Sequence, residues 1–110
     1  MNVKKIAVLG SRAMGHGIAQ VCAQGGFNVC LEDIQEEFVQ NGLSRIRTFL
    51  QGSVERKKMR QEEADGVLER IKTTTDLKEA IYNANFVIEA IVENLEIKQK
   101  TKSLNLWQSL

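Results

Sequence analysis

Short, almost uninterrupted apolar segments alternate with longer segments of helical periodicity along this chain. Uninterrupted apolar runs are typical of parallel strands, because helices cover both faces of a parallel sheet. Strands are expected over Val3–Leu9, Phe27–Leu31, Lys72–Thr75 and Phe86–Val92. Helices are expected over Met14–Gln24, Gln35–Met59, from Gln61 onward, over Asp76–Tyr82, and from Asn94 onward. This order predicts an α/β fold, with a doubly wound parallel sheet and a helical hairpin after the second strand.

The expected helices carry apolar residues at the spacing that places them on one face. The first helix is expected to bury Ile18, Val21, Cys22 and Gly25, which follow each other at i, i+3, i+4 and i+7. The positions expected to be buried by the hairpin are Phe38, Leu43, Ile46, Phe49, Leu50, Val54, Val67, Leu68 and Ile71.

The fourth strand, Phe86–Val92, is apolar on both faces, with Glu89 as its only charge. A complete doubly wound sheet has the strand order 3-2-1-4-5-6, which makes this strand interior. Because only a helix is expected to follow it here, the strand becomes an edge without a protecting proline or lysine. We therefore predict a homodimer or higher oligomer through the exposed fourth strand and the terminal helix, with Trp107 buried.

Composition and charge restrict the classes of function. The 110 residues are expected to form one domain, residues 1–110, and the apolar fraction of 43% is enough for a core. A net charge of +1 favours neither nucleic acid nor an anionic membrane as a partner. No apolar run approaches the ~20 residues that cross a bilayer. The short run within Met1–Gly10 leads into a glycine turn, so we interpret it as a strand and not as a signal peptide.

The two cysteines, Cys22 and Cys30, do not form a C-x-x-C pair, and both lie in apolar patterns. We interpret them as buried, reduced thiols of a cytoplasmic protein. A catalytic thiol would need a partner base, and the only histidine, His16, stands in a glycine turn. A general base also needs a substrate and an orienting partner, so we favour no catalytic role for His16. No metal site is predicted.

That glycine turn is the most informative part of the chain. The segment Ile6–Gly17 reads IAVLGSRAMGHG, a strand, a tight turn and a helix start, which is the arrangement that receives a dinucleotide pyrophosphate. Against the pattern G-x-G-x-x-G, Gly10 and Gly15 are the outer glycines, and Arg12 replaces the middle one. A glycine-rich structural turn without a ligand is the alternative.

Asp33 lies 23 residues after Gly10, at the end of the second expected strand. In dinucleotide-binding folds an acid at this place accepts hydrogen bonds from the adenosine ribose. The same carboxylate would repel a 2′-phosphate, and neither arginine nor lysine follows within Ile34 and Gln35. The sequence therefore predicts NAD in preference to NADP.

The segment GSRAMGHGIAQVCAQGGFNVCLED resembles the opening of the 3-hydroxyacyl-CoA dehydrogenase family, which reads roughly G-x-G-x-M-G-x-G-I-A and then V-x-L-x-D. The resemblance continues in QEEADGVLERIKTTTDLKEA and ANFVIEAIVENLEIK and covers residues 3 to about 100. Hydroxybutyryl-CoA and gulonate dehydrogenases have a similar cofactor domain and stay open as alternatives. The resemblance implies a Rossmann cofactor domain, here truncated.

The resemblance also implies roles for single residues. Gly10 and Gly15 would face the pyrophosphate, Asp33 the ribose, and Glu93 and Lys98 the nicotinamide half of NAD. Together with the residues of the turn, the implied cofactor site is Gly10, Arg12, Ala13, Met14, Gly15, Asp33, Glu93 and Lys98. Lys57, in the basic tip Arg56–Arg60, would touch the tail of an acyl-CoA, and a solvated helix end is the alternative for this tip.

The catalytic His and Glu of the family lie beyond residue 110 in its pattern, as does its helical substrate and dimerisation domain. No catalytic residue is therefore assigned to this chain. After about Lys100 the sequence TKSLNLWQSL departs from the family. The expected function is the NAD-binding part of an oxidoreductase of fatty acid metabolism that transfers hydride between NAD and an L-3-hydroxyacyl-CoA, inactive by itself. The alternative is a self-associating, non-enzymatic remnant that binds no NAD, because Arg12 fills the approach to the pyrophosphate.

Overall fold

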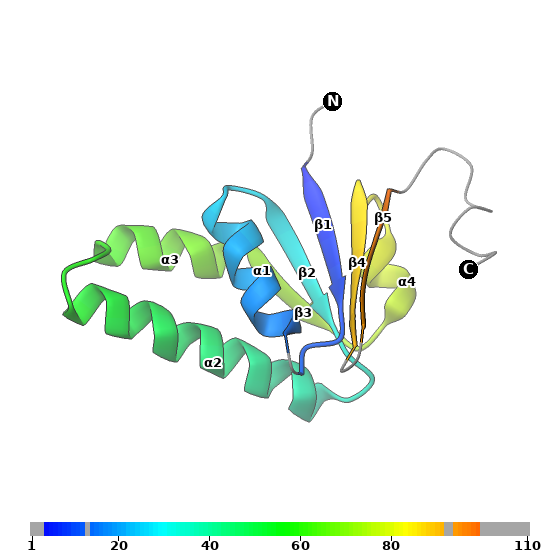
Figure 1. Ribbon diagram of the computed structural model, residues 1–110, viewed down its shortest axis with the longest axis horizontal. Helices are drawn as coiled ribbons and strands as arrows, with labels where there is room; N and C mark the ends of the chain where they lie inside the picture. Colours follow the sequence, from blue (N-terminus) through cyan, green and yellow to red (C-terminus); the bar gives the residue numbers. More distant parts are fainter. Residues whose placement is uncertain (1–3, 13, 92–93, 100–110) are drawn as a thin grey trace.

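The computed structural model describes residues 4–12, 14–91 and 94–99 (Figure 1). Its strands are β1 (Lys5–Leu9), β2 (Asn28–Glu32), β3 (Ile71–Thr74), β4 (Phe86–Ile91) and β5 (Asn94–Gln99). Its helices are α1 (Gly15–Gln24), α2 (Glu36–Glu55), α3 (Gln61–Glu69) and α4 (Leu77–Ile81). The first four strands and the hairpin of α2 and α3 confirm the prediction.

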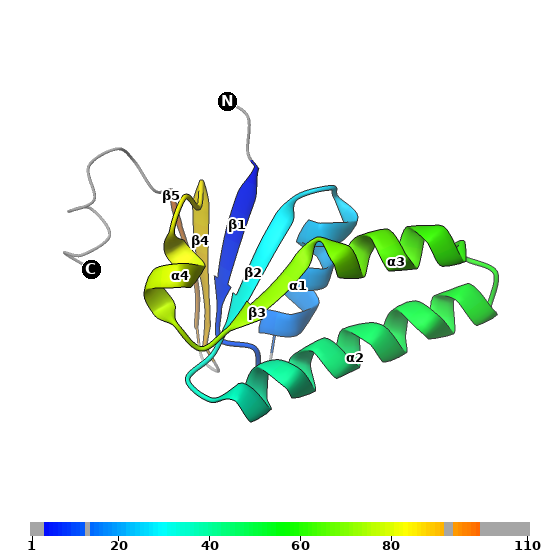
Figure 2. The same cartoon turned by 180° about the vertical axis from the view of Figure 1, so that it is seen from behind.

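The five strands form one sheet in the order β3-β2-β1-β4-β5. Strands β1 to β4 are parallel, and Val8 of the central strand β1 is paired with Leu31 on one side and Ile88 on the other. Figure 1 shows α1 and the α2–α3 hairpin on one face of the sheet, and Figure 2 shows α4 on the other. This is the α/β doubly wound arrangement that the sequence predicts.

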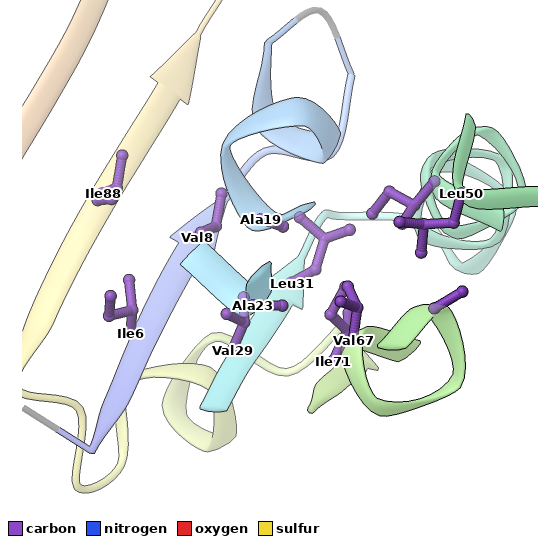
Figure 3. Packing of buried hydrophobic residues seen from close by; sticks show 12 residues of the cluster. Ile6, Val8, Ala19, Ala23, Val29, Leu31, Leu50, Val67, Ile71 and Ile88 are labelled. Atoms are coloured by element: carbon purple, nitrogen blue, oxygen red, sulfur yellow. The ribbon is translucent and has the colours of Figure 1, made fainter. Parts of the chain in front are cut away.

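The larger core lies between the sheet and the three helices α1 to α3 (Figure 3). On the sheet side, Val8, Leu31 and Ile88 are buried. On the α1 side, Ala19 and Ala23 are completely buried, whereas Val21 is 67% exposed. The prediction that Val21 faces the core is therefore wrong. Ile18 and Cys22 are partly buried and pack against this core, as predicted. Ala19 and Ala23 lie nearest the sheet, because their small side chains let α1 approach it closely.

The hairpin packs its own apolar stripe onto this core. Val39, Ile46 and Leu50 of α2 are buried, together with Val67 of α3. Phe49 was expected to be buried, but it is exposed. It lies on the solvent side of the stripe that Ile46 and Leu50 form. A smaller cluster, Ala7, Ala84 and Val87, lies on the opposite face of the sheet beneath α4.

The helix expected from Asn94 is wrong, because residues 94–99 form β5, which runs antiparallel to β4 along Phe86–Ile91. The segment NLEIKQ alternates polar and apolar residues, and this period of two is typical of an antiparallel strand. Strand β4 is consequently interior, so the strand edge predicted for an oligomer is covered by β5. Trp107 and the rest of the expected terminal helix beyond Gln99 lie outside the described residues.

Candidate functional site

The turn between β1 and α1 requires glycine at two positions. Gly10 has a φ of +97°, a conformation that favours glycine, and a Cβ there would collide with the carbonyl oxygen of Ala90. A Cβ on Gly15 would lie 2.7 Å from the carbonyl carbon of Gly10, and closer still to its oxygen. The first turn of α1 is thus held directly against the end of β1. Tight packing of this kind is what the outer glycines of a dinucleotide turn provide.

Asp33 joins the glycine-rich turn to the end of β2. Its Oδ2 accepts hydrogen bonds from the backbone N–H of Ser11 at 2.8 Å and from the Ser11 hydroxyl at 2.9 Å. Its Oδ1 accepts a hydrogen bond from the backbone N–H of Ile34 at 2.7 Å. Burial alone would raise the pKa of Asp33, but these hydrogen bonds and the charge of Arg12 outweigh it and hold the pKa below its ordinary value. Asp33 is therefore an ionised acid at the carboxyl end of β2.

Arg12 directs its side chain towards the same acid. Its Nε lies 3.6 Å from Oδ2 of Asp33, and its guanidinium carbon lies 4.1 Å from the centre of the Phe38 ring. Among the described residues, positive φ outside glycine is confined to Lys57 and Asn83, so Arg12 occupies the place of the middle glycine without backbone strain. Its guanidinium thus lies at the end of β2 and against α2.

His16 holds α1 to the turn. Its Nδ1 donates a hydrogen bond to the carbonyl oxygen of Ser11 at 3.2 Å. Gly42 of α2 approaches the same place, where a Cβ would lie 3.2 Å from Cβ of Ser11 and 3.4 Å from Cβ of His16. These contacts support a structural role for His16. Nothing in the sequence pointed to the contacts of Phe38 and Gly42 with the site, because no local pattern shows that α2 returns to the glycine-rich turn. Ser11 lies in the turn, but its hydrogen bonds to Asp33 join residues 22 apart in the chain.

The structure brings only part of the predicted site together. Met14 is exposed beside Gly15 at the start of α1, whose first turn contains no acidic residue and whose N-terminus has no side-chain cap. Lys98 lies in β5, where its backbone is paired with Val87 and not with the carboxyl end of β4. Lys57 lies at the far tip of the hairpin, a 20-residue helix away from the turn. Ala13 and Glu93 lie outside the described residues.

We next consider metal ligands, thiols and further acids within residues 4–12, 14–91 and 94–99. No group of three or more His, Cys, Asp or Glu side chains there could hold a metal ion. Burial raises the pKa of the half-buried Cys22 and of the buried Cys30, and both are free thiols. Burial, and then the charge of Asp33, also raises the pKa of Glu32. None of the described helices has the length and hydropathy needed to cross a bilayer.

The family model described as "3-hydroxyacyl-CoA dehydrogenase, NAD binding domain" matches residues 5–104. A probable 3-hydroxybutyryl-CoA dehydrogenase of Bacillus subtilis is 40% identical over 98 residues, which are 89% of this chain and 34% of that protein. A glyoxysomal fatty acid beta-oxidation multifunctional protein of Brassica napus is 32% identical over 98 residues, again 89% of this chain but 13% of that protein. The chain thus spans about a third or less of the length of these relatives.

Solved structures agree with the sequence comparison. The crystal structure of a 3-hydroxybutyryl-CoA dehydrogenase from Escherichia coli K12 superposes with a TM-score of 0.80 and 38% sequence identity. The superposition covers 86% of this chain and 20% of that one.

Proposed function

The chain belongs to the family of 3-hydroxyacyl-CoA dehydrogenase NAD-binding domains, and on this premise we propose that its glycine-rich turn binds the pyrophosphate of NAD. The observation that carries the proposal is the closure of the turn, in which Gly10 and Gly15 leave no room for a Cβ. The start of α1, without an acid in its first turn and without a side-chain cap, offers its backbone N–H groups to an anion. The residues present therefore fit the cofactor.

The ribose end of the site is proposed at Asp33. This residue lies at the carboxyl end of β2, where parallel α/β sheets bind their ligands. Its pKa is held below the ordinary value, so at neutral pH it is a carboxylate, which only accepts hydrogen bonds and can therefore take them from ribose hydroxyl groups. Glu93 and Lys98 remain proposed contacts of the nicotinamide half, on the strength of the family resemblance alone. The pairing of Lys98 with Val87, near the start of β4, speaks against that contact.

In the whole enzyme we propose the family's reaction, hydride transfer between NAD and an L-3-hydroxyacyl-CoA in fatty acid metabolism. Residues 1–110 would form its one cofactor domain, and a base from elsewhere would take the proton, since His16 is engaged with the turn. The chain alone is then proposed to be inactive. An acyl-CoA contact at Lys57 and a cytoplasmic location are further parts of this proposal, the latter supported by two free thiols.

The second candidate is a remnant that binds no NAD because Arg12 fills the pyrophosphate approach. The contacts of Arg12 with Asp33 and Phe38 favour the first candidate, because they hold the guanidinium at the end of β2. A homodimer also stays a prediction, and the edge strands of the described sheet are β3 and β5, not β4.

Calorimetric titration with NAD tests the proposal, supported by the shift of the thermal unfolding midpoint. Saturation at a hundredfold excess over Kd should stabilise the fold by about 2.7 kcal/mol. Asp33→Ala should weaken NAD binding by about tenfold, which corresponds to one lost charged hydrogen bond. Asp65→Ala, which removes an exposed acid on α3, is the matched control and should leave binding unchanged. Wild-type chain that is folded but shows neither heat nor a thermal shift at millimolar NAD would contradict the proposal.

A further inference from the structure

Arg12 reaches the place where the adenosine ribose of a dinucleotide is expected. The ion pair with Asp33 draws its guanidinium to the carboxyl end of β2, and the ring of Phe38 lies beneath it at 4.1 Å. The Arg12 side chain is still 61% exposed, whereas that of Asp33 is 5% exposed. A ligand arriving from solvent therefore meets the guanidinium before it meets the carboxylate.

Asp33 has little acceptor capacity left for a ribose. A carboxylate offers about four lone-pair sites, and Ser11 and Ile34 already donate three hydrogen bonds to it. Arg12 stands beside Oδ2, so the remaining site is on Oδ1. One ribose hydroxyl can bond there, while a second must displace the Ser11 hydroxyl or Arg12. The acid is thus built mainly to hold the turn and the guanidinium.

The guanidinium, in contrast, keeps donors for a ligand. Arginine has five N–H donors in a planar fork that suits phosphate. Its ion pair with Asp33 is made through Nε, and within the described part of the chain no hydrogen bond or ion pair involves its two terminal nitrogens, whose plane rests on the Phe38 ring. The acids that begin α2, Glu36 and Glu37, are exposed, so water and salt screen them.

We infer that Arg12 is a specificity-determining residue, which makes the ribose end of this site tolerant of a 2′-phosphate. A 2′-phosphate carries a charge of about −1.5 to −2 at pH 7. An isolated Asp33 would repel it, but the Arg12–Asp33 pair has no net charge and presents donors to it. Compared with a site that has glycine at position 12, the preference for NAD over NADP is reduced. This inference rests on the proposed function, because it assumes that the turn binds the adenosine half of a dinucleotide.

The experiment measures Kd for NAD and NADP by calorimetry, in wild-type chain and in Arg12→Gly and Arg12→Gln. The ratio of Kd for NADP to Kd for NAD should rise by about tenfold in both variants, as expected for loss of a charged pair to phosphate. Arg47→Gln, which removes an exposed arginine of α2, is the control for net charge and should leave the ratio within about twofold. Adenosine 2′,5′-bisphosphate and 5′-AMP repeat the comparison without a pyrophosphate.

The outcomes separate the inference from the proposed function. If NAD binds and the ratio is the same in wild type and Arg12→Gly, the inference is wrong and the proposed function stands. If Arg47→Gln raises the ratio as much as Arg12→Gln does, net charge explains the effect and the inference is also wrong. If neither dinucleotide binds to folded wild type or to Arg12→Gly, both are wrong. A rise specific to Arg12, larger at low salt, supports the inference.

Discussion

Replacing Gly15 by alanine should destabilise this chain far more than the same replacement two residues later. The Cβ of alanine at position 15 would lie 2.7 Å from the carbonyl carbon of Gly10, and nearer to its oxygen. Ordinary contacts between carbon atoms are about 3.5–4.0 Å. The contact with the carbonyl carbon alone would require the N-terminus of α1 to move away from β1 by about 1 Å, and the nearer oxygen requires more.

That movement is resisted by tight packing along α1. Ala19 and Ala23 are completely buried against the sheet, so a shift of the helix opens gaps around both. Overpacking of a well-filled core costs about 1–3 kcal/mol, and here the obstacle is backbone, which cannot rotate away. We expect a loss near 3 kcal/mol in the free energy of unfolding. For a chain of this size the melting temperature would fall by roughly 10–20 °C.

Gly17→Ala is the matched control. Nothing lies within 4 Å of a Cβ at Gly17, and this residue is also within α1. Alanine in place of glycine in a helix gains up to about 1 kcal/mol, so this variant should melt at or above the wild-type temperature. Urea unfolding followed by circular dichroism gives both differences. A Gly15→Ala chain within about 0.5 kcal/mol of wild type would refute the close approach of α1 to the turn.

Two further predictions follow from the same site. The pKa of Asp33 is lower in the folded chain than its ordinary value of 3.8, so its ionised form stabilises the fold. This stabilisation is complete above pH 3.8 and is lost as the pH falls through the lower pKa of the folded state. Urea midpoints of wild type and Asp33→Asn should therefore converge at the acid end of a pH series, and a constant gap would speak against the shift. With acetoacetyl-CoA and NADH the chain should show no turnover, and turnover that His16→Ala abolishes would overturn the structural role given to His16.

The local sequence pattern was sufficient to predict the strands, which are continuous apolar runs, and the glycine-rich turn. The runs around Val8, Leu31 and Ile88 predicted strands, and each of these residues is buried in the sheet. The spacing of Gly10 and Gly15 predicted a turn that packs closely, as their missing room for a Cβ shows. The strands and the turn depend on neighbours in sequence, so the sequence displays them directly. The contact of Gly10 with Ala90, in contrast, requires β4 to lie beside β1.

The wrong predictions concern positions whose structure depends on segments distant in the sequence. Val21 and Ala23 both fit a helical stripe, and only the short distance between α1 and the sheet selects Ala23. The segment from Asn94 to Gln99 has the alternation of a strand, but its pairing with β4 depends on a reversal of the chain. The position of the Arg12 side chain depends on Phe38, which α2 brings back to the turn. Such contacts follow from tertiary packing and have no local signature.

Because β5 runs back along β4, a polypeptide that continues after Gln99 starts at the end of the sheet far from the glycine-rich turn. Gln99 is paired with Phe86, and Phe86 is paired with Ile6. Gln99 and the start of β1 therefore lie at the same end of the strands. The glycine-rich turn lies at the opposite end of the strands. The six residues of β4, being extended, separate the two ends by about 20 Å. A domain attached after Gln99 would have to cover this distance, through a linker or through its own dimensions, to reach the glycine-rich turn. Where a flexible linker covers it, the frequency with which the attached domain meets the turn would depend on the length and stiffness of that linker.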